Sequence, residues 1–138
     1  MDNNNLMMTN KPAVLIVEDN KINALVLKKT IQEICEPDHV ICDEAVFKAV
    51  SEREYQIILM DINLGGNSLD GEAIMKILKE DERYRHIPIF AVTSYAMPGD
   101  EERFLQAGFD RYYSKPIARN KIKGDLSLAL SQEGQENG

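Results

Sequence analysis

The sequence predicts a doubly wound α/β sandwich built on a five-stranded parallel sheet. Short apolar runs alternate five times with amphipathic stretches of helical spacing. Strands that are apolar throughout are typical of a parallel sheet covered on both faces, and right-handed crossovers between them place helices on each face. The length of 138 residues suits one domain with a core of its own.

The five strands are predicted from the apolar runs. Each run is four or five residues long, which is the ordinary length of a buried strand. The predicted strands are Ala13–Val17, His39–Cys42, Gln56–Met60, Pro88–Val92 and Phe109–Tyr113.

A helix is predicted after each strand. Ile22, Leu25 and Val26 share one face of the first helix. The fourth helix starts near Pro98, carries acids in its first turn and ends before Gly108, as helix termini favour. The predicted helices are Asn20–Cys35, Asp43–Arg53, Glu72–Lys79, Pro98–Ala107 and about Ile117–Leu130.

The composition argues against several classes of protein. Lys and Arg number 16 against 23 Asp and Glu, a net charge of −7, which argues against wide nucleic-acid binding. No apolar run approaches the roughly 20 residues needed for a membrane span, and the polar start lacks the pattern of a secretory signal. Cys35 and Cys42 are too few for a disulfide scaffold, so we expect a cytoplasmic setting.

Polar side chains follow four of the five predicted strands. Glu18 and Asp19 follow the first strand, Asp61 the third, Thr93 the fourth and Lys115 the fifth. Each has an ordinary interpretation when taken alone, as a helix-starting acid, a turn residue, a cap or a solvated charge. However, ligands of doubly wound sheets bind beyond the carboxyl ends of the strands, where these five residues lie.

The combination of these residues favours a site for phosphoryl transfer. Three converging carboxylates repel one another unless a cation lies between them, and Mg²⁺ prefers carboxylates, waters and a phosphate oxygen. A lysine and a threonine suit the remaining phosphoryl oxygens. The sequence therefore predicts a site that transfers phosphate to a carboxylate.

Four motifs carry a resemblance to a known family. They are VLIVEDN (Val14 to Asn20), ILMDINL (Ile58 to Leu64), AVTSYAMPGD (Ala91 to Asp100) and YYSKPI (Tyr112 to Ile117). In order and spacing they resemble the receiver domain of two-component response regulators, over roughly Pro12 to Leu130. The chain is similar to single-domain regulators of the DivK type and to the receivers of hybrid histidine kinases.

The resemblance implies a fold and a domain organisation. The fold would be the flavodoxin-like (βα)5 sandwich. The receiver domain would span residues 12–131, with a flexible N-terminal tail over 1–11 and a flexible C-terminal tail over 132–138.

The resemblance also implies a set of site residues. Asp61 would be the phosphoacceptor. Asp19 would bind Mg²⁺ directly with Glu18 assisting, and Asn63 would offer its backbone carbonyl to the metal.

Further residues would act on the phosphoryl group or respond to it. Thr93 and Lys115 would contact its oxygens, and the bond from Lys115 to Pro116 would be cis. Tyr112 would be an aromatic switch that turns inward when Thr93 moves. The side chains of Asn63 and Tyr95 would tune hydrolysis of the phosphate.

The implied function is a signalling switch. Asp61 would accept a phosphoryl group from a phosphohistidine on a histidine kinase or a histidine phosphotransfer protein. The last three elements, from about residue 98 onward, would then signal to a downstream protein target. The chain would act as a stand-alone regulator or a phosphorelay shuttle, catalysing its own phosphorylation and dephosphorylation without being a classical enzyme.

Three alternatives stay open at this point. The chain could be a receiver-fold interaction module without phosphate turnover, or a receiver domain cut from a hybrid histidine kinase. A haloacid-dehalogenase-like phosphatase also uses an aspartyl nucleophile and Mg²⁺, but it needs a second Asp where this chain has Asn63.

The loop after Asp61 and the two histidines carry further expectations. The loop from Leu64 to Gly71 is about two residues longer than the commonest receiver form, lacks its proline and is rich in glycine, so we expect it to move more. His39 and His86 are lone histidines, for which we expect surface or satisfied positions.

Overall fold

The computed structural model describes residues 11–66, 68–94 and 96–137, and it confirms the predicted fold class. Five parallel strands form one sheet in the order β2-β1-β3-β4-β5, the flavodoxin-like arrangement. The strands are β1 (Ala13–Val17), β2 (Glu36–Val40), β3 (Ile57–Asp61), β4 (Ile89–Thr93) and β5 (Arg111–Ser114). The helices are α2 (Lys21–Ile31), α3 (Asp43–Glu52), α4 (Gly71–Glu80), α5 (Asp100–Ala107) and α6 (Arg119–Asn137).

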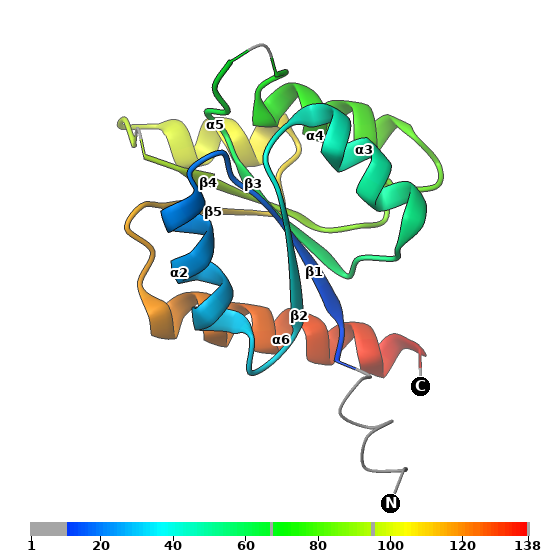
Figure 1. Ribbon diagram of the computed structural model, residues 1–138. Coiled ribbons are helices and arrows are strands. Elements are labelled where there is room, and N and C mark those ends of the chain that lie inside the picture. The colour runs from blue at the N-terminus through cyan, green and yellow to red at the C-terminus, as the bar shows by residue number, and fades with distance from the viewer. Residues whose placement is uncertain (1–10, 67, 95, 138) are drawn as a thin grey trace, which may run out of the picture.

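The helices cover the two faces of the sheet unequally. α2 and α6 lie on one face, whereas α3, α4 and α5 lie on the other (Figure 1). Val46, Ile74 and Phe104 pack from the three-helix layer, and Ile31 and Ile122 pack from the two-helix layer. Because β1, β3 and β4 are buried along their whole length between these layers, the sheet is a rigid support for the residues at its edge.

The bounds of β2 differ from the prediction. The strand starts three residues before the predicted range His39–Cys42, in a stretch of weak strand formers. Pro37 is tolerated because β2 is an edge strand that pairs with β1 alone. Arg53 donates to both Glu36 and Asp38, so the polar side chains of this edge are paired.

The first helix also departs from the prediction. It ends at Ile31 rather than at Cys35, and Ile22, Leu25 and Val26 are 73%, 52% and 52% exposed. The buried face is formed by smaller and later residues, Ala24 and Ile31 among them. The apolar spacing of this segment therefore predicted the helix correctly, and the face that Ile22, Leu25 and Val26 share is exposed.

The ends of the chain bear on the predicted tails. α6 continues to Asn137, past the predicted helix end at Leu130, so the backbone is helical over most of the predicted C-terminal tail. Residues 1–10 of the predicted N-terminal tail lie outside the described residues. Within the ranges that the structure describes, no helix has both the length and the apolarity required to cross a bilayer.

Candidate functional site

The candidate site lies where the direction of strand order reverses. β1 has β2 on one side and β3 on the other. The chain leaves β1 for α2 on one face of the sheet, and it leaves the neighbouring strand β3 for α4 on the opposite face. Doubly wound sheets bind their ligands in the crevice at this point, beyond the carboxyl ends of the strands.

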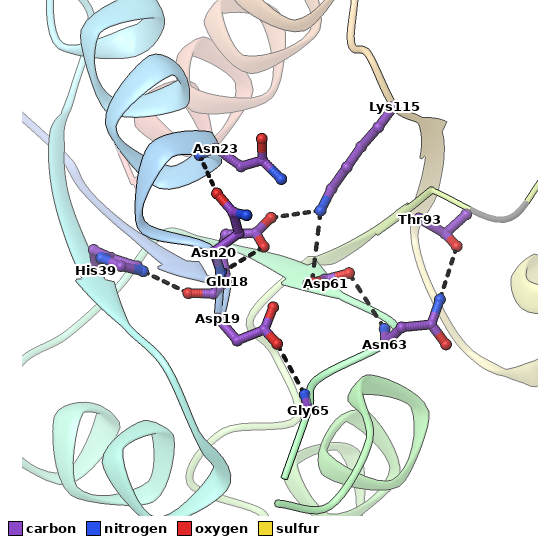
Figure 2. Close-up of polar contacts among 10 residues, drawn as sticks. All are labelled: Glu18, Asp19, Asn20, Asn23, His39, Asp61, Asn63, Gly65, Thr93 and Lys115. Atoms are coloured by element: carbon purple, nitrogen blue, oxygen red, sulfur yellow. Dashed lines mark hydrogen bonds and ion pairs between the residues drawn. The ribbon is translucent and has the colours of Figure 1, made fainter.

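Three carboxylates lie close together at the carboxyl ends of β1 and β3 (Figure 2). One oxygen from each of Glu18, Asp19 and Asp61 lies within 4.8 Å of the others. Glu18 and Asp61 are each only 4% exposed, whereas Asp19 faces solvent. Such a group of oxygen ligands, open on one side, fits a hard cation that keeps some of its water.

Lys115 supplies the positive charge among these acids. Its Nζ lies 2.6 Å from Glu18 Oε1 and 3.6 Å from Asp61 Oδ2, as Figure 2 shows. The residue directly follows β5, and its backbone N–H donates to the carbonyl of Thr93 at 2.8 Å, which continues the ladder between β4 and β5. The bond from Lys115 to Pro116 is cis, as predicted.

The pKa of Asp61 is strongly shifted by its place in the site. Burial, and after it the charge of Glu18, raises the pKa of Asp61 to about 7, although Lys115 and the backbone N–H of Asn63 act in the opposite direction. The charged form of Asp61 is therefore disfavoured in this environment, and a bound cation would stabilise it.

The turn between β1 and α2 holds Glu18 in place. The backbone N–H of Asn20 donates to Glu18 Oε2 at 3.0 Å, and the Asn20 side chain caps α2 by accepting from the N–H of Asn23. A ring nitrogen of His39 lies 2.6 Å from the carbonyl oxygen of Glu18. His39 is thus satisfied, as expected, but its place beside the site could not be predicted because it depends on the register of β2.

Thr93 and Asn63 lie on the other side of Asp61. Thr93 is 1% exposed, and its Oγ1 accepts from Asn63 Nδ2 at 3.3 Å. The backbone N–H of Asn63 donates to Asp61 Oδ1 at 3.2 Å. Asn63 therefore connects the candidate acceptor with the candidate switch residue (Figure 2). Tyr95 lies outside the described residues.

Tyr112 is half-buried on β5 and belongs to a different environment. Its ring stacks on that of Phe104 from α5, with 5.9 Å between centroids and 16° between planes. Direct contacts thus join Glu18, Lys115, Asp61, Asn63 and Thr93. The carboxylate of Asp19 lies within 4.8 Å of those of Glu18 and Asp61, while Tyr112 packs against α5.

Two contacts were missed by the reasoning from sequence. The backbone N–H of Gly65 donates to Asp19 Oδ2 at 3.0 Å, and Asp43 exchanges hydrogen bonds with Ser68 and Leu69. Both depend on the path of the loop between β3 and α4, for which the sequence carries no signal beyond its glycines.

Acids at the carboxyl ends of β1 and β3, a threonine that ends β4 and a lysine directly after β5 are the arrangement that the four sequence motifs predict for a receiver domain of two-component signalling. The chain belongs to the response regulator receiver domain family, whose model matches residues 14–127. It is 40% identical over 109 residues to the polar-differentiation response regulator DivK of Brucella ovis. The match covers 77% of this chain and 85% of that protein, so the chain is a DivK-like receiver domain.

Solved structures show the same relationship. The receiver domain of a signal transduction histidine kinase from Syntrophus aciditrophicus has a TM-score of 0.78 and 27% identity, over 88% of this chain and 91% of that one. The receiver domain of the sensor histidine kinase PA1611 from Pseudomonas aeruginosa has a TM-score of 0.77 and 30% identity, over 88% and 98%. That receiver was solved with a magnesium ion in its active-site cleft.

Proposed function

We propose that this chain is a phosphorylatable receiver in which Asp61 accepts a phosphoryl group in a Mg²⁺-dependent reaction. The donor is a phosphohistidine on a histidine kinase or a histidine phosphotransfer protein of the cytoplasm. The observation that carries the proposal is the contact of Lys115 with both Glu18 and Asp61, at 2.6 and 3.6 Å, inside a cluster of three carboxylates.

The residues of the site fit the metal that the family implies. Carboxylates and a backbone carbonyl are the hard oxygen ligands that Mg²⁺ takes. Burial, and after it the charge of Glu18, raises the pKa of Asp61, so a cation beside it would favour the charged carboxylate. Glu18, Asp19, Asp61 and the carbonyl of Asn63 would hold the ion. When bound, it would neutralise charge on the carboxylates and on the phosphoryl oxygens.

The side chains account for the transfer itself. A carboxylate oxygen of Asp61 attacks phosphorus as the P–N bond of the phosphohistidine breaks, and the departing imidazole nitrogen keeps the electron pair and takes up a proton. The ammonium of Lys115 stabilises negative charge on the phosphoryl oxygens. Water later attacks phosphorus, breaks the P–O bond and returns the carboxylate and inorganic phosphate.

The signal is a shift between two conformations. Phosphorylation adds charge and strong acceptor oxygens. The Thr93 hydroxyl then donates a hydrogen bond to a phosphoryl oxygen and no longer accepts one from Asn63. Tyr112 then turns inward from its place against Phe104. A groove of about 550 Å³ lies beside it, lined by residues of α5, β5 and α6, and this surface would contact the downstream protein target.

A stand-alone regulator or phosphorelay shuttle is the form that the comparisons support best. The DivK regulators match at 39–40% identity with 85% of their length covered. The cited receivers of histidine kinases match at 27% and 30%.

Intact-mass measurement tests the proposal. Incubation with acetyl phosphate and Mg²⁺ is expected to add the mass of one phosphoryl group, and EDTA should prevent the addition. The Asp61→Asn protein should stay unmodified under the same conditions. A wild-type chain that gains no mass would contradict phosphate turnover and favour a receiver-fold interaction module.

A further inference from the structure

The loop between β3 and α4 is closed at its base. The backbone N–H of Gly71 donates to the carbonyl of Ile62 at 3.0 Å, and Asp70 caps α4 by accepting from the N–H of Ala73. The ends of this segment therefore meet, as they do in compact surface loops whose ends lie close together. Any further restraint on the loop must come from contacts along its length.

One such contact involves a carboxylate of the acidic cluster. The N–H of Gly65 donates to Asp19 Oδ2 at 3.0 Å (Figure 2). A β-carbon at Gly65 would itself lie 3.0 Å from that oxygen, so the backbone approaches Asp19 as closely as its atoms allow. Asp19 is the exposed member of the cluster, and its carboxylate direction is therefore set by this donor.

A second contact ties the loop to α3. The backbone N–H of Asp43 donates to Ser68 Oγ at 2.9 Å, and Asp43 Oδ2 accepts from the N–H of Leu69 at 3.1 Å. The hydrogen bond from Leu69 lowers the pKa of Asp43, so its carboxylate is charged at neutral pH and the bond is charge-assisted. Asp43 also begins α3, which places this anchor on a rigid helix.

We propose that Asp43 is a positioning residue for Asp19, acting through the loop that carries Gly65. The inference rests on the proposed function, because it concerns the affinity of the Mg²⁺ site. With Asp43 in place the loop is pinned on α3 and the Gly65 N–H stays on the carboxylate of Asp19. Without it the loop moves, the donor leaves and Asp19 must be ordered when the cation binds. Ligating carboxylates generally depend on hydrogen bonds of this kind.

Two measurements on the full chain test the inference. Calorimetric titration with Mg²⁺ gives the dissociation constant, and amide hydrogen exchange of Gly65 in the absence of metal reports the contact to Asp19 directly. In Asp43→Ala we expect the dissociation constant to rise about tenfold and the Gly65 amide to exchange faster by a similar factor. Glu44→Ala is the matched control, since Glu44 is an exposed acid in the same first turn of α3, and it should leave both values unchanged.

A second variant guards against a folding defect. Ser68→Ala removes one side of the anchor and leaves α3 intact, so it should shift both values in the same direction by less. Unchanged Gly65 exchange in either variant, or faster exchange at an unchanged Mg²⁺ affinity, would overturn the inference. A wild-type chain that binds no Mg²⁺ would overturn the proposed function with it, whereas normal wild-type binding combined with unaffected variants overturns the inference alone.

Discussion

Asp61 is buried between a like charge and an opposite one. Glu18 and Asp61 are almost inaccessible to solvent, and Lys115 lies closer to Glu18 than to Asp61. Burial, and after it the charge of Glu18, therefore raises the pKa of Asp61, and Lys115 offsets only part of this effect. A cation bound beside Asp61 would stabilise its charged form.

The pH dependence of stability follows from this pKa. The folded-state pKa of Asp61 lies near 7, above its ordinary 3.8, so the folded state binds more protons between these values. The stability that Asp61 contributes is present below about pH 4 and is lost as the pH rises through 7. Asp61→Asn removes this loss, so in the absence of metal its stability advantage should grow between pH 4 and 8, by on the order of 3 kcal/mol.

Urea denaturation across this pH range measures the effect. If the Asp61→Asn curve ran parallel to that of the wild type, the raised pKa of Asp61 would be refuted.

The residues of the site could be predicted to different degrees. Glu18, Asp19, Asp61, Thr93 and Lys115 follow strands whose carboxyl ends meet at one edge, so their convergence follows from topology. The contacts of His39, Gly65 and Asp43 depend on the register of an edge strand and on the path of a loop. Neither is encoded in the periodicity of apolar residues, so these partners became visible only in three dimensions.

At the scale of elements, burial decides what the sequence predicts well. β1, β3 and β4 lie within one residue of their predicted bounds because each is an apolar run buried on both faces. β2 is the edge strand, and its residues are partly exposed and paired through Arg53. Its position is set by pairing with β1, which local propensity does not report.

The first residue of α4, Gly71, packs tightly against the end of β3. A β-carbon at Gly71 would lie 2.3 Å from the carbonyl oxygen of Asp61, so Gly71→Ala must push α4 away from β3. We expect a loss of about 2–3 kcal/mol in the free energy of unfolding.

A second glycine provides the comparison. Gly124 lies inside α6, and a β-carbon there would meet nothing within 4 Å. Gly124→Ala should therefore stabilise the protein by about 0.5–1 kcal/mol through helix propensity. Chemical denaturation of both variants measures the difference, and equal stabilities would contradict the close approach of α4 to β3.

At the scale of the molecule, the sheet connects the site with the groove at α5, β5 and α6. Thr93 ends β4 beside Asp61, and Tyr112 lies on the neighbouring strand β5 against Phe104. Moving a two-state population from mostly inactive to mostly active requires about 5 kcal/mol of preference. Two hydrogen bonds to a charged phosphoryl group, at about 1.5–3 kcal/mol each, supply that amount when both Thr93 and Lys115 contribute.

Removing the hydrogen bond from Thr93 should affect the conformational switch without preventing phosphorylation. Thr93→Val should still take up phosphate from acetyl phosphate, but the active population should fall by about tenfold or more because one bond is lost. Amide NMR shifts of β5 and α5, recorded with and without phosphorylation, report the population. A Thr93→Val protein whose β5 shifts change as fully as those of the wild type would show that Thr93 is not the switch.

If the fold gathers Glu18, Asp19 and Lys115 around Asp61 as proposed, Asp61 alone should accept the phosphoryl group. The most direct measurement traps the acyl phosphate by borohydride reduction and locates the modified residue by peptide mass spectrometry. We predict modification at Asp61 when acetyl phosphate and Mg²⁺ are present, and none in EDTA. Modification at Asp19 or at any other residue, or modification of Asp61 that proceeds equally without Mg²⁺, would refute the assignment of Asp61 as the Mg²⁺-dependent acceptor.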